Sequence, residues 1–381
     1  MSSSAFYQNF SLGVLGGGQL GRMLIQSAID FNIDVHCIDP DASAPCSKIA
    51  HYFTHGSITD YDAVYAFGKN CDLITIEIEN VNTEALKKLE AEGVKVFPQP
   101  AIIELIQDKR LQKQFYKKNG IPTADFLLTQ NREEVYTNSD FLPAFHKLGR
   151  EGYDGRGVVG LNTIADIEQA FDKPGVLEKR IDFEKEISVI VARNERGEVK
   201  VYPAVELIFH PTANLVEYLF APASISQSLE DKASNIAIKV IETLDMVGLL
   251  AVEMFVTKTG EILVNEIAPR THNSGHQTIE GNVTSQFEQH LRAILNMPLG
   301  NTEVILPTAM VNLLGEPGYS GLAQYEGLEE VLKIEGAHIH LYGKKQTKPF
   351  RKMGHVTIAD NDLSQLKEKA LIIKQTLKIK A

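Results

Sequence analysis

Residues 10 to 100 alternate short apolar runs with helical patterns, and few folds accommodate such an alternation. The segment from Ser11 to Leu15 is predicted to be a strand. The helix predicted after it has an apolar stripe made by Leu20, Met23, Leu24, Ala28 and Phe31. Further strands are predicted at 35–38 and 73–78, with a helix at 83–92 that ends at Gly93. Strands that alternate with helices in this way indicate a parallel α/β layer.

A glycine-rich turn, Gly16-Gly-Gly-Gln-Leu-Gly21, joins the first predicted strand to the first predicted helix. Its glycines permit a close approach of the backbone, and its amides face any bound anion. Asp39 ends the next strand, 18 residues after Gly21. Taken alone, this pattern predicts a dinucleotide site and an NAD-dependent oxidoreductase. The same turn also binds single phosphates in other enzymes, and a purely structural turn is a further alternative.

Length and charge restrict the class of protein. At 381 residues the chain is too long for one ordinary core, so two or three domains are expected. The formal net charge of −11 argues against a nucleic-acid partner, because phosphate backbones need a basic surface. The 3 cysteines lack CxxC spacing, which favours a reducing compartment over disulfides or zinc. No segment approaches the ~20 apolar residues of a membrane span and the N-terminus lacks a signal-like pattern, so a cytoplasmic protein without a membrane partner is expected.

The rest of the chain is predicted to contain further domains. A long amphipathic helix with many basic side chains is predicted from Ala101 to Gly120. Strands are predicted near 176–181 and 186–192, and a helix at 230–244. After Pro298 the pattern changes to short strands around Met310, His338 and Val356, followed by a helix at 363–377. This change predicts a small appended domain.

Two glutamates, Glu253 and Glu266, lie on either side of a short turn. If the chain reverses at Thr259-Gly260, they face each other across an antiparallel ladder, with Cβ atoms roughly 5 Å apart and like charges that repel. A cation would relieve the repulsion, and carboxylates together with phosphates are usual ligands of Mg²⁺. The alternative is a solvated edge hairpin whose register differs by one, which moves one carboxylate to the other face.

A second glycine cluster, Gly152-Tyr-Asp-Gly-Arg-Gly157, follows Lys147. It lacks the Gly-Lys-Ser/Thr ending of a Walker loop, but its amides can fold over phosphates while Lys147 supplies a point charge. A flexible surface hairpin is the alternative. Glu178-Lys-Arg-Ile181 ends a predicted strand, and Glu186 follows at a spacing suited to an adenine edge and a ribose diol. An ordinary charged strand end would look the same.

Polar residues also gather after the second hairpin glutamate. The cluster consists of Arg270, His272, Asn273 and His276. Such a density of donors beside a predicted metal site indicates a polar ligand, with a network of helix caps as the alternative. Further along, a basic patch suits a phosphate monoester or forms a solvated charged face; it consists of Lys344, Lys345, Arg351 and Lys352.

Together these segments resemble the ATP-grasp superfamily and, within it, the 5-(carboxyamino)imidazole ribonucleotide synthase family of purine biosynthesis. The resemblance covers nearly the whole chain. It rests on the segments 16–23, 152–157, 265–270, 272–276, 285–291 and 352–355. Ala268 stands where many ATP-grasp enzymes have Asn, a departure typical of this family. Leu148 and Glu151 depart from its more usual small or basic residues.

The resemblance implies an ATP-grasp architecture of α/β and α+β class. An N-terminal Rossmann-like domain would span residues 1–100, and an ATP-grasp domain would span 101–297, with a glycine-loop lid subdomain at about 123–183. A small C-terminal β-rich domain would span 298–381.

The implied activity is that of an ATP-dependent carbon–nitrogen ligase. Such an enzyme carboxylates 5-aminoimidazole ribonucleotide with ATP and bicarbonate, through carboxyphosphate, and releases ADP and phosphate. Mg²⁺ is the implied cofactor and a homodimer the implied assembly. Three alternatives stay open: another ATP-grasp ligase, such as formate-dependent glycinamide ribonucleotide transformylase or biotin carboxylase, the NAD-dependent oxidoreductase, and a nucleotide sensor without turnover.

The resemblance also implies roles for single residues. ATP would be bound by Lys109, Lys147, Gly152, Tyr153, Asp154, Gly155, Arg156, Gly157, Val158, Glu178, Lys179, Arg180, Ile181, Glu186, His210, Asn265 and Glu266. The metal would be held by Glu253 and Glu266. The imidazole nucleotide would be bound by Gln19, Glu79, Tyr153, Asp154, Arg156, Arg270, His272, Asn273, Lys344 and Arg351. The catalytic residues would be Arg270, Lys147, Asp154 and His276.

Overall fold

The N-terminal part of the chain forms a parallel sheet covered by helices, as predicted. In the computed structural model, which describes residues 10–150, 152, 157–210 and 215–381, its strand order is β3-β2-β1-β4-β5. The strands are β1 (Ser11–Leu15), β2 (Asp34–Asp39), β3 (Tyr52–His55), β4 (Leu73–Ile76) and β5 (Lys95–Val96). The helices are α1 (Gln19–Asp30), α2 (Tyr61–Gly68) and α3 (Thr83–Ala91).

The long helix predicted at 101–120 is wrong. Two helices, α4 (Pro100–Ile106) and α5 (Lys109–Lys118), occupy this segment. Asp108 separates them, because its side chain accepts a hydrogen bond from the backbone N–H of Arg110 and so caps the start of α5. The apolar periodicity continues across the break, which is why it suggested one helix. The break directs α5 towards the next lobe.

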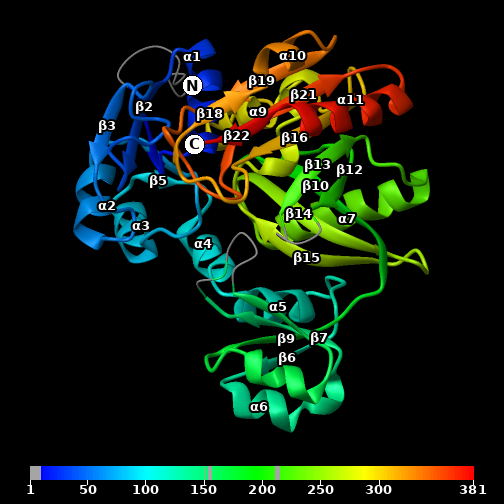
Figure 1. Ribbon diagram of the computed structural model, residues 1–381. Helices are drawn as coiled ribbons and strands as arrows, with labels where there is room; N and C mark the ends of the chain where they lie inside the picture. The colour runs from blue at the N-terminus through cyan, green and yellow to red at the C-terminus, as the bar shows by residue number, and fades with distance from the viewer. Residues whose placement is uncertain (1–9, 151, 153–156, 211–214) are drawn as a thin grey trace.

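A small lobe hangs below the rest of the molecule in Figure 1. Its antiparallel sheet has the order β6-β9-β7-β8. The elements are β6 (Phe126–Thr129), α6 (Arg132–Thr137), β7 (Ala144–Leu148), β8 (Val158–Leu161) and β9 (Gly175–Lys179), with short 3₁₀ helices at Ser139–Phe141 and Ile164–Gln169. The lobe has its own core, which includes Val135, Leu161 and Leu177. Its strands β7 and β9 carry Lys147 and Glu178 towards the main body.

The main body is a large sheet whose strands follow the order β15-β14-β10-β12-β13-β16-β21-β19, with β11 paired to β10. Its first strands are β10 (Phe183–Arg193), β11 (Val199–Val201), β12 (Val205–Phe209), β13 (Val216–Ala221), β14 (Gly248–Thr257) and β15 (Ile262–Ala268). Helix α7 (Gln227–Thr243) shares a core with β10 and β14. Helix α9 (Gln286–Ile294) packs against α1, so the body and the N-terminal domain share a second core.

The glutamate hairpin has the predicted pairing and an unpredicted bulge. Glu253 of β14 lies opposite Glu266 of β15. Nearer the turn, however, Met254 pairs with Val264, so the register shifts and Asn265 is an extra residue on β15. Such a β-bulge bends its strand and redirects the side chains beside it. The extra residue places Asn265 next to the two glutamates.

The C-terminal strands continue the large sheet. The elements are β16 (Thr308–Leu314), β17 (Gly321–Leu322), β18 (Gln324–Glu326), α10 (Leu328–Leu332), β19 (Ala337–Leu341), β20 (Gln346–Thr347), β21 (Lys352–Ala359), α11 (Leu363–Thr376) and β22 (Lys378–Lys380). Strand β16 pairs with β13 on one side and with β21 on the other. The small C-terminal unit therefore lies close to the polar loop after β15. No helix in the described part of the chain combines the length and apolar character that crossing a bilayer requires.

Candidate active site

Two lysines and a buried glutamate meet where the small lobe joins the main body. Lys147 Nζ donates to Glu178 Oε1 at 2.9 Å and to Asn265 Oδ1 at 3.1 Å. Lys113 of α5 pairs with the other oxygen of Glu178 and donates to Thr123 Oγ1 at 2.6 Å. Glu178 is only 3% exposed, and although burial opposes it, the two lysine charges hold the pKa of Glu178 below its ordinary value. Glu178 therefore acts as a counter-ion that fixes the amine of Lys147 beside the bulge.

Three carboxylates converge next to this network. Glu253 and Glu266 face each other, and Glu186 lies on β10 on the same face of the sheet, two residues from the partner of Glu253. Lys109 Nζ donates to Glu266 Oε2 at 2.8 Å, while His272 Nε2 lies 3.8 Å from Glu253 Oε1. The adjacent strands thus bring three carboxylates together, and Lys109 forms an ion pair with only one of them, Glu266.

The pKa values reflect this excess of negative charge. Burial, together with the charges of Glu266 and Glu186, raises the pKa of Glu253 well above its ordinary value. The ammonium of Lys109 lowers the pKa of Glu266, although the Glu266 side chain is 47% exposed and solvent screens part of the pair. One glutamate thus favours the neutral form and its partner the charged form.

The two opposed glutamates fit a divalent cation. Among the described residues, no group of three or more His, Cys, Asp or Glu side chains is arranged to hold a metal ion alone. Mg²⁺ is usually bound through one or two carboxylates plus water and substrate phosphates, so a pair is the number expected for a nucleotide-dependent site. The ammonium of Lys109 already lies where positive charge is needed.

The ionisation of Glu186 gives a test of this electrostatic arrangement. Burial, followed by the charge of Glu266, raises the pKa of Glu186 from 4.5 to about 7. The folded state thus favours the neutral carboxyl, and the stability that this form supplies is fully present below pH 4.5 and is lost as the pH rises through about 7. Glutamine never ionises. Glu186→Gln is therefore expected to raise the Tm relative to wild type at pH 8 and to change it little at pH 5.

Thermal melts of both proteins at the two pH values check this result. Glu184→Gln is the matched control, because Glu184 is exposed on the same strand. A Glu186→Gln variant less stable than the wild type at pH 8 would contradict the burial argument.

The remaining residues predicted to bind ATP are distributed as follows. Lys179 Nζ donates to the carbonyls of Phe141 and Leu142 inside the small lobe, and Arg180 Nη1 donates to Asn162 Oδ1. Gly157, Val158 and Ile181 flank the same lobe, and the backbone N–H of Leu148 donates to the Gly157 carbonyl at 2.8 Å. The predicted contacts by Tyr153, Asp154, Gly155 and Arg156 lie outside the described residues, whereas Gly152 lies within them. His210 packs its ring against Phe350 at 5.4 Å, next to Arg351.

Several residues predicted to bind the second substrate lie at the carboxyl edge of the N-terminal sheet, whereas the predicted contacts by Tyr153, Asp154 and Arg156 lie outside the described residues. Arg270 Nε lies 2.8 Å from Glu79 Oε1, which links the loop after β15 to the loop after β4. Gln19 begins α1 at the same edge. Asn273 exchanges two amide hydrogen bonds of 2.9 Å with Asn312 of β16.

The C-terminal basic residues complete this edge. Lys344 Nζ donates to the Lys352 carbonyl at 2.8 Å, and Arg351 Nη1 donates to the Gln346 carbonyl at 2.7 Å. The charge of Arg351 helps to lower the pKa of Asp41, which follows β2, after the larger effect of hydrogen bonds from Ser43. The basic segment therefore faces the N-terminal sheet.

The glycine turn is filled by the protein's own carboxylates. Gly17 N–H donates to Asp39 Oδ2 at 2.6 Å, and Leu20 N–H donates to Glu77 Oε1 at 3.1 Å. A Cβ atom added at Gly18 would lie only 2.4 Å from Glu77 Oε1, so a larger residue would have to displace that carboxylate. A dinucleotide pyrophosphate would have to displace both carboxylates. The geometry therefore does not support the NAD-dependent interpretation.

Sequence reasoning missed Lys113 and Glu77. Lys113 lies one helical turn after Lys109, so that spacing could have indicated a second inward-facing lysine. Glu77 directly follows a buried strand of a parallel sheet, where ligands often bind. Burial raises the pKa of Glu77 to about 7, while the nearby charges of Arg270 and Lys344 partly oppose the shift. Glu77 therefore lies between the glycine turn and the predicted substrate residues.

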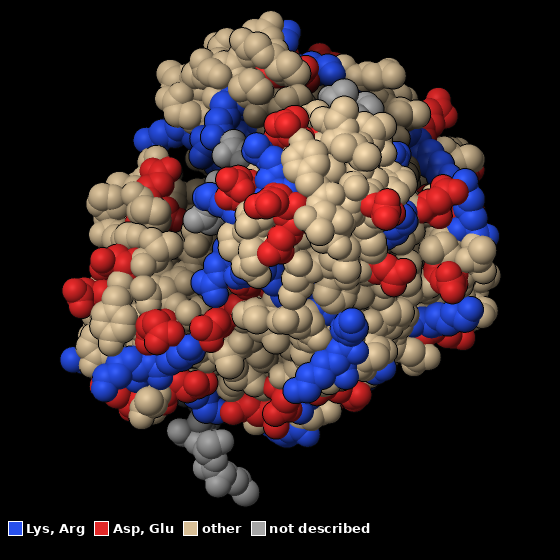
Figure 2. Space-filling model, turned by 90° about the horizontal axis from the view of Figure 1, so that it is seen from below, with Lys and Arg blue, Asp and Glu red and all other residues tan. Residues whose placement is uncertain are grey.

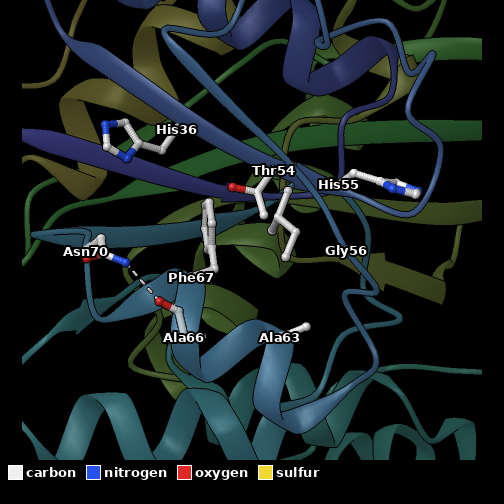
Figure 3. Close-up of a pocket in the computed structure, with 9 residues that line it drawn as sticks. His36, Thr54, His55, Gly56, Ala63, Ala66, Phe67 and Asn70 are labelled. Atoms are coloured by element: carbon white, nitrogen blue, oxygen red, sulfur yellow. Dashed lines mark hydrogen bonds between the residues drawn. The ribbon is translucent and has the colours of Figure 1, made fainter.

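A separate cavity of about 390 Å³ lies in the N-terminal domain. Figure 3 shows Phe67 and Ala63 of α2 on one side of it and Thr54 of β3 on the other, with the ring of His55 pointing away from them. None of the residues predicted to bind ATP, metal or substrate lines this cavity. It carries none of the chemistry described above.

The face of the molecule drawn in Figure 2 shows no broad field of one charge among the described residues. Lysine and arginine side chains lie beside aspartate and glutamate in scattered groups, and uncharged residues cover most of this face. This mixture agrees with the acidic net charge of −11. It is unlike the continuous basic surface that a phosphate backbone needs.

Family models match three consecutive parts of the chain. The ribonucleotide synthetase preATP-grasp domain matches residues 10–107, and the ATP-grasp domain matches residues 114–287. The phosphoribosylaminoimidazole carboxylase C-terminal domain matches residues 308–369. The three matches follow the N-terminal sheet, the lobe with the main body, and the C-terminal strands.

Individual proteins match over nearly the full chain. A crystal structure of N5-carboxyaminoimidazole ribonucleotide synthetase from Thermotoga maritima has 44% identity and a TM-score of 0.90, covering 98% of this chain and 99% of that one. The Aspergillus clavatus N5-carboxyaminoimidazole synthase, solved with ADP and 5-aminoimidazole ribonucleotide, has 35% identity and a TM-score of 0.87, covering 96% and 98%. The Bacillus subtilis N5-carboxyaminoimidazole ribonucleotide synthase is 37% identical over 94% of this chain and 93% of its own length. Two longer phosphoribosylaminoimidazole carboxylases also match, and the chain spans 66% and 69% of their lengths.

Proposed function

The chain belongs to the N5-carboxyaminoimidazole ribonucleotide synthase family of ATP-grasp ligases in purine biosynthesis, and we propose that it carboxylates the amine of 5-aminoimidazole ribonucleotide with ATP and bicarbonate. The observation that carries the proposal is the opposed pair Glu253 and Glu266 beside Lys147 and Asn265. This arrangement supports a role in holding a nucleotide triphosphate. Arg270 and the basic C-terminal segment lie on the neighbouring side, where a second, phosphorylated substrate fits.

The proposed carboxylation has two steps, phosphoryl transfer to bicarbonate and then carboxyl transfer to the amine. An oxygen of bicarbonate attacks the γ-phosphorus of ATP, the bond to the β-phosphate oxygen breaks, and ADP leaves. The exocyclic amine then attacks the carbonyl carbon of carboxyphosphate, inorganic phosphate leaves with the bonding electrons, and the amine loses a proton. Lys147 and Arg270 would neutralise charge on the transferring phosphoryl group and orient it.

Glu253 and Glu266 would hold Mg²⁺, with Asn265 beside the triphosphate. When bound, this cation would supply charge neutralisation on the phosphate oxygens. The buried Glu178 would hold the Lys147 amine in place before substrate arrives, so little reorganisation is needed during transfer. The glycine loop as a lid, the homodimer and the cytoplasmic location stay predictions from the sequence.

The other functions considered above have less support. Formate-dependent glycinamide ribonucleotide transformylase and biotin carboxylase are also ATP-grasp ligases, but the match to the phosphoribosylaminoimidazole carboxylase C-terminal domain favours the aminoimidazole acceptor. A nucleotide sensor would bind ATP without turnover. Only an assay with varied acceptors separates these activities.

The test is steady-state ADP release with ATP, magnesium and bicarbonate, measured with 5-aminoimidazole ribonucleotide, without it, and with glycinamide ribonucleotide instead. The proposal expects ADP release that depends on both bicarbonate and the aminoimidazole nucleotide. Release that is equal with either acceptor, or with none, would overturn it.

The basic C-terminal segment provides a prediction about the second substrate. Arg351→Ala is expected to raise the KM for the aminoimidazole nucleotide by about 10- to 100-fold, because the substitution removes one charge-assisted contact to its phosphate. The KM for ATP is expected to stay nearly unchanged. Lys348→Ala, an exposed cation of the same segment, is the control. An equal rise in both KM values would refute the phosphate role of Arg351.

A further inference from the structure

Three imidazole rings stack across the junction between the loop after β15 and the C-terminal strands. His340 of β19 and His355 of β21 are cross-strand partners, with ring centroids 4.4 Å apart and planes at 9°. His276 lies on the other side of His355, at 4.7 Å and 30°. His276 and His355 are at most 1% exposed. We call His276, His355 and His340 the histidine stack.

The edges of the rings are held by groups from different elements. His355 Nδ1 shares a hydrogen bond of 2.9 Å with the hydroxyl of Tyr342. His276 Nδ1 lies 3.2 Å from Gln286 Nε2 of α9, and His340 Nε2 lies 2.8 Å from Glu280 Oε1 of α8 (Thr278–Gly281). The two outer rings are therefore attached to the ATP-grasp body. The central ring is attached to the C-terminal unit.

The stack is connected directly to both sides of the substrate edge. On one side, Gln286 also bonds the backbone of His272, accepting from its N–H at 2.9 Å and donating to its carbonyl at 2.7 Å. On the other side, Tyr342 N–H donates to the Met353 carbonyl, and Lys344 lies above the Tyr342 ring at 5.6 Å. A shift of the central ring would therefore change the spacing between the polar loop and the basic segment.

Within the part of the chain that the structure describes, the imidazole of His355 has a buried unpaired nitrogen, a feature that the His290 ring outside the stack shares. Among the described residues, His355 Nε2 and Glu280 Oε2 are buried without a hydrogen-bond partner. A buried unpaired polar group costs stability that an apolar side chain of similar size avoids. Burial, followed by the neighbouring charges, lowers the pKa of His276 and of His355 well below the ordinary value. The His276 and His355 rings therefore favour the neutral form and can stack without mutual repulsion.

We propose that the histidine stack is a positioning device for the aminoimidazole nucleotide. His355 is its central positioning residue, and it acts through the elements attached to it rather than by touching the reacting atoms. The stack holds the loop that carries His272 and the segment that carries Lys344 at the spacing of one nucleotide, from its imidazole amine to its phosphate. This inference rests on the proposed function. It reassigns His276 from catalysis to positioning.

The experiment compares His355→Leu with His290→Leu in the ADP-release assay. His290 is a matched control, because it is also a buried histidine and also has one side-chain partner, Thr75 Oγ1 at 2.9 Å, but it lies outside the stack. His355→Leu is expected to raise the KM for the aminoimidazole nucleotide on the order of tenfold, because the two elements that bind it would no longer be held ready for it, with the KM for ATP unchanged. His290→Leu is expected to lower the Tm by a similar amount without changing either KM.

Tyr342→Phe provides the second variant, because it removes only the hydroxyl that holds the edge of His355. It is expected to raise the same KM in the same selective way, and it decides the matter if His355→Leu does not fold. Unchanged KM values, or equal changes for both substrates, would show that the stack serves packing only. If the wild type itself releases no ADP in response to the nucleotide, the proposed function fails instead, so the two failures are distinguishable.

Discussion

Glu266→Gln is expected to reduce bicarbonate-dependent ADP release by at least about 100-fold while leaving the fold intact. The amide keeps the size and shape of the side chain but removes the negative charge that faces Glu253. A cation between the two side chains would then have one carboxylate ligand instead of two. Lys109 would also lose its ionic partner at 2.8 Å, although this pair is partly exposed and its loss should affect stability little.

The measurement is ADP release at saturating substrates, with a thermal melt of each protein to confirm folding. Glu261→Gln is the control, because Glu261 is an exposed glutamate at the turn of the same hairpin. Wild-type turnover in the Glu266→Gln variant would end the assignment of the metal site. A similar loss in the control would show that the hairpin, rather than the charge, is responsible.

Lys147→Met is expected to lower kcat by about 100-fold or more, because the substitution keeps the length of the side chain and removes the cation beside Asn265. It should also lower the free energy of unfolding by about 1–3 kcal/mol, since the buried Glu178 would lose one of its two charge-assisted partners. The loss is limited because Lys113 still pairs with Glu178.

Single-turnover phosphoryl transfer and chemical denaturation measure these two effects separately. Lys117→Met serves as the control, since Lys117 is an exposed cation on α5. If Lys147→Met were destabilised but kept the wild-type kcat, Lys147 would be a structural partner of Glu178 only.

Patterns local in the sequence predicted the class of the N-terminal domain and several later elements, but missed others such as β3, α2, β12 and β13. Apolar periodicity identified the parallel N-terminal layer, because buried positions recur along a helix or a strand with the period of that element. The same signal failed at Asp108, where a side chain caps a new helix without interrupting the apolar stripe. The pairing of Glu253 with Glu266 was predicted correctly, but the bulge at Asn265 was missed, although the consecutive polar residues Asn265 and Glu266 interrupt the apolar alternation of β15.

The site was less predictable than the fold, because its contacts join distant segments. Nothing near Glu178 in the sequence indicates that Lys113 pairs with it from another element. Likewise, the stacking of His276 on His355 depends on the C-terminal strands joining the large sheet through β13 and β16. Motif resemblance indicated which residues to consider. The contacts between these residues could be identified only in the three-dimensional structure.

A crystal structure with magnesium and a non-hydrolysable ATP analogue would test directly whether Glu253 and Glu266 coordinate one divalent cation beside the phosphates of ATP. We expect one ion at about 2.0–2.1 Å from a carboxylate oxygen of each glutamate, with phosphate oxygens completing the shell. Both side chains turned away from each other, with the nucleotide bound and no ion between them, would contradict it.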